Sequence, residues 1–262
     1  MTNNDHYTLH LPRILCLHGG GTNAPIFRAQ CRRLIAQLES EFRFVFAEAP
    51  FDSQAGPDVL SVYSRWGPFK RWLRWHEGQP AISHAEAVEE IDHALHSAME
   101  NDDIRGATGD WIGLLGFSQG AKVAASVLYQ QQMHQNTKGL NLKNKFKFGV
   151  LFAGRAPLVW LESDVSCHHG FSDASQISST QHTSSSKARL LSDGLLQLPT
   201  IHIHGLQDEG LDSHRELLEY CDPRSTRLVE LNLGHRLPLK SQDVGLVVNQ
   251  IRETMRRTEK DV

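Results

Sequence analysis

The stretch Gly116-Phe117-Ser118-Gln119-Gly120 matches the G-x-S-x-G pattern, which presents a nucleophilic serine on a sharp turn. Apolar residues 111–115 before it predict a short buried strand, and residues 121–128 after it predict a helix. A strand-to-helix turn is the setting that this pattern requires. Glycines two residues before and after the serine allow the strand and the helix to approach closely. The stretch therefore predicts a nucleophile elbow.

An acid and a histidine follow the serine in the order expected for a hydrolase. Asp208 comes just after one predicted strand, and His235 just after the next. The chain order serine, acid, histidine is that of α/β-hydrolases and differs from the orders in chymotrypsin and subtilisin. Glu209 and Asp212 are alternative acids, and we favour Asp208 because it directly follows the strand and loop that should aim it at the histidine. The predicted catalytic residues are Ser118, Asp208 and His235.

A glycine-rich loop, His18-Gly19-Gly20-Gly21-Thr22-Asn23, follows the first predicted strand. In an α/β-hydrolase such a loop supplies one backbone N–H to the oxyanion hole, and the residue after the nucleophile supplies the other. We therefore expect the oxyanion hole to combine the N–H of Gln119 with that of Gly20. We interpret His18 as a residue that orders the loop. The loop matches neither glycine pattern of nucleotide-binding sites.

Strands and helices alternate along the chain. This alternation predicts a mainly parallel sheet with helices on both faces, the α/β-hydrolase fold, in a single domain over residues 1–262. The last helix should begin after Ser241, because serine is a good N-cap residue. The predicted strands are 13–17, 42–47, 111–115, 146–152, 198–203 and 227–231, and the earlier predicted helices are 25–39, 84–99 and 121–128.

Composition excludes several function classes. The 262 residues carry a net charge of −3 and a pI near 6.6, which gives no support for a nucleic-acid partner. Four cysteines without C-x-x-C spacing indicate free thiols in a reducing compartment. The polar N-terminus lacks an apolar signal core, and no apolar run reaches membrane-spanning length. We expect a cytoplasmic protein without a membrane span.

Histidine pairs provide the only hint of a metal site. His202 and His204 share one side of a predicted strand, and His168 and His169 are adjacent. No carboxylate or cysteine stands at a spacing typical of a metal centre. We interpret them as packed and solvated histidines, and we expect neither a metal nor a cofactor.

Two segments interrupt the alternation. Residues 162–187 are rich in Ser, His and Thr and predict a surface loop or a lid insertion. Residues 64–78 are rich in aromatic and basic residues, and we expect Trp66, Phe69 and Trp72 to line an acyl pocket. The alternative is the simple core packing of a helix. The basic residues, which should face solvent or an acidic carrier protein, are Arg65, Lys70, Arg71 and Arg74.

As an ordered set, these motifs resemble the fungal family of serine hydrolases related to ovarian-tumour-associated hydrolases. Within that family the chain is most similar to the polyketide-cluster releasing thioesterases of the lovastatin type. The resemblance covers nearly the whole chain, and residues 163–187 depart from it. The stretches that carry it are residues 17–23, 26–28, 48–51, 67–72, 116–120, 199–202, 208 and 234–238.

The resemblance implies that Ser118, Asp208 and His235 form a catalytic triad. It also implies an acyl or polyketide substrate, which an acyl carrier protein would present as a thioester. Two other function classes stay open at this point. One is a carboxylesterase acting on small diffusible esters, and the other is a binding protein that has the hydrolase fold without the activity.

Overall fold

The computed structural model describes residues 6–57, 59–138, 146–163, 170–177 and 194–260. The segment expected to form a surface loop or lid, residues 162–187, falls mostly outside these ranges, so that expectation stays a prediction. Cys167 and the pair at 168–169 also lie outside them. The three cysteines that are described, Cys16, Cys31 and Cys221, are buried free thiols, as expected.

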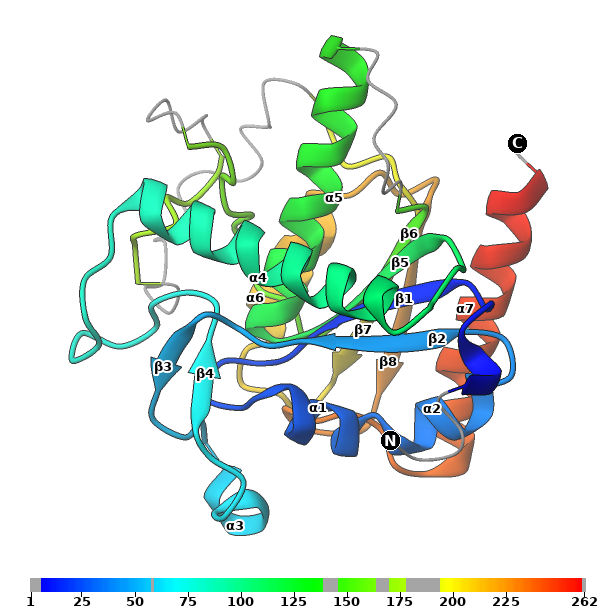
Figure 1. The fold of residues 1–262 in the computed structure, drawn as a ribbon, viewed down its shortest axis with the longest axis horizontal. Helices are drawn as coiled ribbons and strands as arrows, with labels where there is room; N and C mark the ends of the chain where they lie inside the picture. The colour runs from blue at the N-terminus through cyan, green and yellow to red at the C-terminus, as the bar shows by residue number, and fades with distance from the viewer. Residues whose placement is uncertain (1–5, 58, 139–145, 164–169, 178–193, 261–262) are drawn as a thin grey trace.

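A six-stranded parallel sheet in the order β2-β1-β5-β6-β7-β8 forms the centre of the molecule (Figure 1). Its inner strands are buried on both faces, which explains why they read as continuous apolar runs in the sequence. The strands are β1 Arg13–Leu17, β2 Arg43–Ala47, β5 Trp111–Phe117, β6 Phe148–Phe152, β7 Thr200–Gly205 and β8 Thr226–Leu231. The predicted α/β-hydrolase architecture is confirmed.

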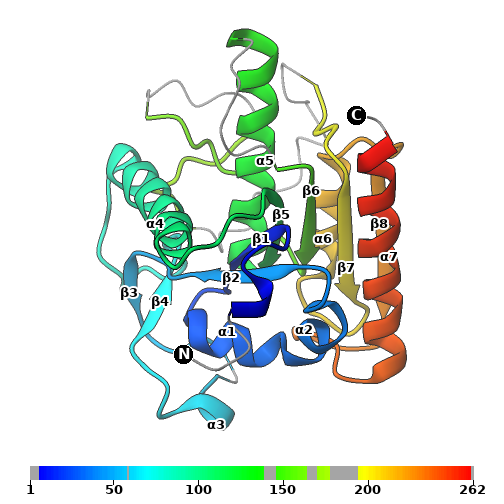
Figure 2. The same ribbon diagram turned by 45° about the vertical axis from the view of Figure 1, so that its right-hand side comes forward.

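Helices cover both faces of the sheet (Figures 1 and 2). Two separate apolar clusters result, one under α4, α5 and α6 and the other under α1, α2 and α7. The helices are α1 Ala24–Gln30, α2 Arg32–Leu38, α4 His84–Ile104, α5 Gln119–Lys138, α6 Leu211–Glu219 and α7 Ser241–Lys260, with the short helices η1 His6–Thr8 and α3 Val59–Tyr63.

The order of the strands places the site. From β1 the chain first goes outward to β2 and then returns to the other side of β1 with β5. The direction of winding therefore reverses between β1 and β5. In open α/β sheets the crevice at the carboxyl ends of such strands is the usual place for a ligand. The glycine-rich loop follows β1 and Ser118 follows β5, so both lie at this reversal.

An excursion of the chain leaves the sheet after β2. It contains a two-stranded antiparallel pair, β3 Phe51–Ser53 and β4 Phe69–Arg71, and the short helix α3 between them. Both views show α3 projecting from the body of the molecule (Figures 1 and 2). Residues 64–78 thus contain a strand and turns, so the alternative of a packed helix is wrong about the helix, whereas the core packing that it expected is found for Trp72.

Two helix predictions differ in detail. The predicted helix 25–39 is divided at Cys31, which ends α1 and precedes α2. Ser241 is the first residue of α7 and does not precede it, because the Val244 N–H already bonds to the Lys240 carbonyl.

No helix among the described residues is long and apolar enough to cross a membrane. The cytoplasmic location expected from the sequence stays a prediction.

A buried ion pair joins the sheet to α4 at the end opposite Ser118. Arg43 Nε lies 2.9 Å from Asp102 Oδ2, and Arg43 Nη2 lies 2.6 Å from Asp102 Oδ1. Arg13 Nη1 approaches the same carboxylate at 3.5 Å. All three side chains are buried.

We predict that Asp102→Asn destabilises the protein by about 3 to 5 kcal/mol, because the buried guanidinium of Arg43 loses its compensating charge and Arg13 keeps only its ion pair with Asp103. The melting temperature should fall by roughly 10 °C in differential scanning calorimetry. Asp92→Asn on the exposed side of α4 is the matched control and should change it little. An unchanged melting temperature for Asp102→Asn would show that the ion pair contributes no stability.

Candidate active site

Ser118 lies on the tight turn between β5 and α5. Its φ of 54° is in the left-handed region, which costs a residue other than glycine roughly 1–2 kcal/mol. The turn is held by the Ser118 N–H, which donates to the Phe152 carbonyl at 2.8 Å. The Ser118 carbonyl accepts the N–H groups of Ala121 and Lys122 at the start of the helix. This strained backbone is the geometry of a nucleophile elbow.

The two flanking glycines have no room for a side chain. A Cβ on Gly120 would lie 2.2 Å from the Leu17 carbonyl oxygen and 2.5 Å from that of His18. A Cβ on Gly116 would lie 2.4 Å from the Gly120 oxygen. Backbone atoms cannot move away as a flexible side chain can. The expectation that close approach requires glycine at both positions is confirmed.

The loops after three different strands bring together the three residues predicted as catalytic. His235 Nε2 lies 3.0 Å from Ser118 Oγ, and His235 Nδ1 lies 2.6 Å from Asp208 Oδ2. Burial by itself raises the pKa of Asp208, but the hydrogen bond and charge of His235 and the Gly210 N–H together lower it to about 2. The ionised carboxylate accepts the Nδ1–H, so Nε2 is left to accept the serine proton.

The alternative acids lie elsewhere. Glu209 and Asp212 are both exposed, whereas Asp208 is buried. Within the described ranges, neither of these two side chains contacts His235. The geometry therefore favours Asp208 among the three acids that follow β7.

Gly20 and Gln119 lie side by side at the turn. A Cβ on Gly20 would lie 3.1 Å from Gln119 Oε1. Among the residues that the structure describes, no acceptor is bound to the backbone N–H of either one. The side chain of Gln119 accepts the N–H of Trp72 at 2.8 Å and donates to the Leu73 carbonyl at 2.9 Å. Its side chain is thus anchored while its main-chain N–H stays free for a ligand.

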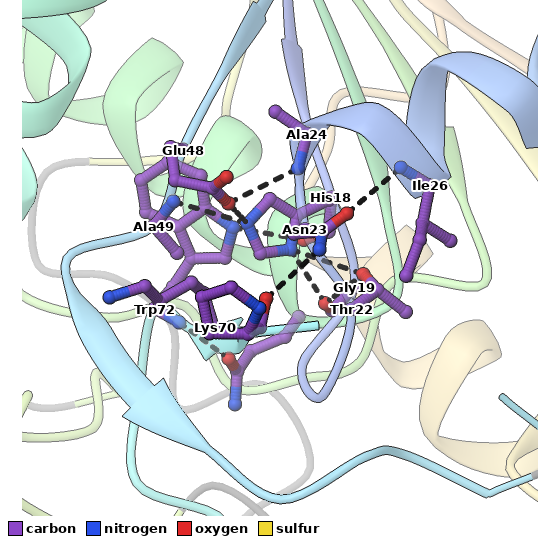
Figure 3. A network of polar contacts seen from close by, with 12 residues as sticks. His18, Gly19, Thr22, Asn23, Ala24, Ile26, Glu48, Ala49, Lys70 and Trp72 are labelled. Atoms are coloured by element: carbon purple, nitrogen blue, oxygen red, sulfur yellow. Dashed lines mark hydrogen bonds and ion pairs between the residues drawn. The ribbon is translucent and has the colours of Figure 1, made fainter. Parts of the chain in front are cut away.

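His18 orders the glycine-rich loop, as expected (Figure 3). Its ring is fully buried, with Nδ1 2.8 Å from the Gly19 carbonyl and Nε2 accepting the Ala49 N–H at 3.1 Å. The Trp72 indole N–H donates to the His18 carbonyl at 2.9 Å. Both ring nitrogens are therefore engaged with the backbone, and neither is directed to the Ser118 hydroxyl.

A cavity of about 950 Å³ opens beside Ser118. Gly20, Gln119 and His235 are among the residues that line it. Its apolar wall comes from α3, from the segment after β4 and from the loop after β8. The residues of this wall are Val59, Val62, Tyr63, Trp75, Leu237 and Leu239.

The three aromatic residues expected to bind substrate do not line this cavity, so that expectation needs correction. Trp72 is fully buried behind the glycine-rich loop. Trp66 is 46% exposed and packs edge-on against Tyr63, and Phe69 belongs to β4. The aromatic residue of the segment that does reach the cavity is Trp75. Phe69 is placed by the pairing of β3 with β4, whereas the backbones of Trp72 and Trp75 are held by hydrogen bonds to the side chains of Gln119 and Gln79.

The basic residues of the same segment do not form a solvent-facing cluster. Arg71 is buried, with its guanidinium 5.0 Å from the centre of the Phe51 ring. Lys70 Nζ pairs with Asp52 Oδ1 at 2.7 Å, and Arg74 donates to backbone carbonyls of its own turn. Of the four, Arg65 is the exposed one. The expected basic face toward a carrier protein is therefore wrong for Arg71.

Buried histidines surround the carboxylate of Asp208. His214 Nε2 lies 3.8 Å from Asp208 Oδ2, and its ring lies between those of His204 and His235, tilted against both. Burial lowers the pKa of His202 to about 3, that of His204 to about 4 and that of His214 to about 3, so all three are neutral at pH 7. His202 and His204 are packed, buried residues of β7, as expected.

Among the described residues, one group has ligand atoms close enough to hold a metal ion. These atoms belong to Asp208, His214 and His235 and lie within 4.8 Å of one another. Two of the three residues are already hydrogen-bonded to each other and, through His235, to Ser118. A metal bound here would compete with that arrangement. The geometry therefore favours proton transfer to and from Ser118 over metal binding.

Sequence reasoning missed most residues of the cavity wall, among them the two inner cations Lys122 and Arg155. The signal for Lys122 was present, because it is the single charged residue in the apolar run Ala121–Ser126 at the start of α5. Arg155 follows Ala153, whose φ of 49° turns the chain sharply after β6. Such a turn has no pattern that is visible in the sequence.

Comparison with known proteins agrees with this geometry. The chain matches the model of the serine hydrolase (FSH1) family over residues 7–247. It is 57% identical to the esterase claE of Penicillium crustosum over 257 residues, which cover 97% of this chain and 96% of that protein. It is 54% identical to the esterase citA of Monascus ruber over 253 residues, with 96% and 95% covered.

Solved structures agree at the level of the fold. Esterase PE8 superimposes with a TM-score of 0.51 at 17% identity, over 94% of this chain and 93% of that one. ClbQ from the colibactin NRPS/PKS pathway superimposes with a TM-score of 0.50 at 14% identity, over 96% and 100%. With the elbow at the switch point and the family match along nearly its whole length, the chain belongs to the serine hydrolase (FSH1) family and has the α/β-hydrolase fold.

Proposed function

We propose that Ser118, His235 and Asp208 are the catalytic triad of this hydrolase and that it cleaves an acyl ester or thioester. The observation that carries the proposal is the continuous hydrogen-bonded series, 3.0 Å from serine to histidine and 2.6 Å from histidine to carboxylate. These distances are within the reach needed by a nucleophile and its general base. The series lies beside a cavity large enough for an acyl chain.

The proposed reaction follows the hydrogen bonds that join the serine, the histidine and the carboxylate. His235 Nε2 takes the proton of the Ser118 hydroxyl as Oγ attacks the carbonyl carbon, and Asp208 stabilises the imidazolium that forms. The imidazolium then gives its proton to the leaving alcohol or thiol, and an acyl-enzyme remains. Water attacks the acyl-enzyme with His235 again as base, which releases the acid and restores the serine.

We propose that the N–H groups of Gln119 and Gly20 hold the oxyanion of the tetrahedral intermediate. Both line the cavity beside Ser118, and neither is bound to an acceptor among the described residues. A donor of this kind contributes about 3 kcal/mol to the stabilisation of the transition state. The anchored side chain of Gln119 keeps its N–H in place during the reaction.

The proposed triad and oxyanion hole would act in the same way on an ester and on a thioester. Relatives named esterases, such as claE and citA, support an ester. Release of a polyketide or other acyl chain from a carrier protein rests on the resemblance described in the sequence, and the buried position of Arg71 removes one argument for carrier docking. A small diffusible ester is therefore the second candidate. A hydrolase-fold binding protein without activity is disfavoured, because the three side chains keep mutual hydrogen bonds.

We expect Ser118→Ala to abolish labelling by a fluorophosphonate probe and to lower kcat for p-nitrophenyl butyrate by at least about 10³-fold, because the nucleophile is removed. The measurements are gel fluorescence of the labelled protein and initial rates at saturating substrate. Thermal unfolding monitors the fold, which should persist. Turnover within tenfold of wild type would remove Ser118 from the mechanism.

We expect Asp208→Asn to lower kcat by roughly 10⁴-fold, because an amide favours the wrong imidazole tautomer. Glu209→Gln and Asp212→Asn are matched controls on the same loop and helix, and both should stay near wild type because their side chains are exposed. Initial rates on the same ester provide the comparison. If Glu209→Gln were the impaired variant, the acid would have to be reassigned.

A further inference from the structure

The described residues that line the cavity beside Ser118 include cations and no acid. Four basic residues lie in its wall, and none of the described residues that line it is Asp or Glu. The four are Arg32, Lys122, Arg155 and Arg236. The whole chain carries a net charge of −3, so this concentration of positive charge runs against the overall balance. Cavities lined by one sign of charge attract ligands of the opposite sign.

Two of these cations lie inside and two lie at the surface. Lys122 is only 2% exposed and is one helical turn beyond Ser118 in α5. Arg155 is partly buried in the loop after β6. Arg32 and Arg236 are exposed. Lys122 and Arg155, the inner pair, are therefore placed to bind a ligand inside the cavity. Arg32 and Arg236, the outer pair, lie at its rim.

Neither inner cation has a partner of opposite charge within the described part of the chain. Lys122 makes no ion pair there, and Arg155 Nε is buried without a hydrogen-bond partner. The buried Arg13 and Arg43, in contrast, share the carboxylate of Asp102. A buried charge without a partner is costly, so proteins seldom keep one. A bound anion would provide the missing partner.

We propose that Lys122 and Arg155 form a subsite for a carboxylate carried by the acyl chain, so that the preferred substrate is an ester or thioester of an acid that has a second, anionic group. The inference rests on the proposed hydrolysis at Ser118, because it names the substrate class of that same site. A guanidinium matches the two oxygens of a carboxylate, and an ammonium adds a second point charge.

The electrostatics of Lys122 agree with this assignment. Burial, with a further contribution from the positive charge of Arg155, lowers the pKa of Lys122 to about 7. An anion between the two cations would offset both effects and favour the charged ammonium. The guanidinium of Arg155 lies against Gly210, since a Cβ there would be 2.7 Å from Arg155 Nη2. The subsite thus adjoins the loop that carries Asp208, next to the reacting groups.

The first test compares two esters that differ only in the distant end. Mono-p-nitrophenyl adipate ends in a carboxylate, and p-nitrophenyl methyl adipate ends in a neutral ester. The readout is the ratio of kcat/KM for the carboxylate ester to kcat/KM for the methyl ester. We expect a ratio of at least about ten for the wild type, since a hydrogen bond to a charged group contributes that much. Lys122→Met and Arg155→Gln should each lower the ratio about tenfold.

Lys147→Met is the matched control. Lys147 directly precedes β6 at the opposite end of the sheet and does not line the cavity, so its loss should leave the ratio unchanged. A wild-type ratio near one would overturn the subsite. So would a ratio that Lys122→Met and Arg155→Gln both leave unchanged. A wild type that hydrolyses neither ester and resists fluorophosphonate would instead count against the proposed function.

The second test needs no turnover. In the Ser118→Ala background, millimolar adipate should raise the melting temperature, and dimethyl adipate should not. The shift should disappear in Ser118→Ala with Lys122→Met, which also tests whether that variant is folded. Inorganic phosphate separates a carboxylate subsite from a general anion site, because an equal shift with phosphate would contradict the assignment to the acyl chain. No shift with adipate would overturn the proposal.

Discussion

The contact between Gly120 and the end of β1 is the constraint on which the rest of the site depends. A side chain there would overlap the carbonyl oxygens of Leu17 and His18. Because these two backbones touch, the start of α5 has one position relative to β1. Ser118 and the glycine-rich loop are thereby held at the reversal of winding in the sheet, where the helices that follow β1 and β5 pack on opposite faces. Ser118 accepts an unfavourable backbone conformation as a consequence.

Buried hydrogen bonds connect the elbow and the glycine-rich loop to the segment that follows β4. The amide of Gln119 holds the backbone of Trp72 and Leu73, and the indole of Trp72 holds the carbonyl of His18. The excursion that contains β3, α3 and β4 is therefore attached to the elbow by fully satisfied polar groups, which make a unique arrangement more favourable than its alternatives. Val59 and Trp75 reach the cavity because of this attachment.

Carboxylates are distributed unequally between the two ends of the sheet. At the amino ends of β1 and β2, Asp102 and Asp103 together provide the carboxylates for the two buried arginines Arg13 and Arg43. At the carboxyl ends, the carboxylate of Asp208 is occupied by His235 and the Gly210 N–H. No acid among the described residues lines the cavity beside its cations, and an anionic substrate group would therefore complement this wall.

Much of the fold could be predicted from the sequence, because its signals are local. The elbow is recognised from five residues between an apolar strand and a helix, and the order of Ser118, Asp208 and His235 along the chain predicted the loops that meet at the site. The parallel sheet followed from the alternation of buried strands and amphipathic helices. Each of these features can be recognised from the spacing of apolar residues within one strand or helix, or from a glycine in a tight turn.

The walls of the cavity were decided by the tertiary structure alone. Arg71 is placed by the pairing of β3 with β4, and the backbones of Trp72 and Trp75 are held by the side chains of Gln119 and Gln79. As a result Trp75 lines the cavity while Trp72 and Arg71 are buried. Lys122 could be seen in the sequence as a charge in an apolar helix, but its neighbour Arg155 comes from a loop 33 residues further along the chain. Side chains outside regular elements take their direction from long-range contacts, and a local pattern contains no record of those contacts.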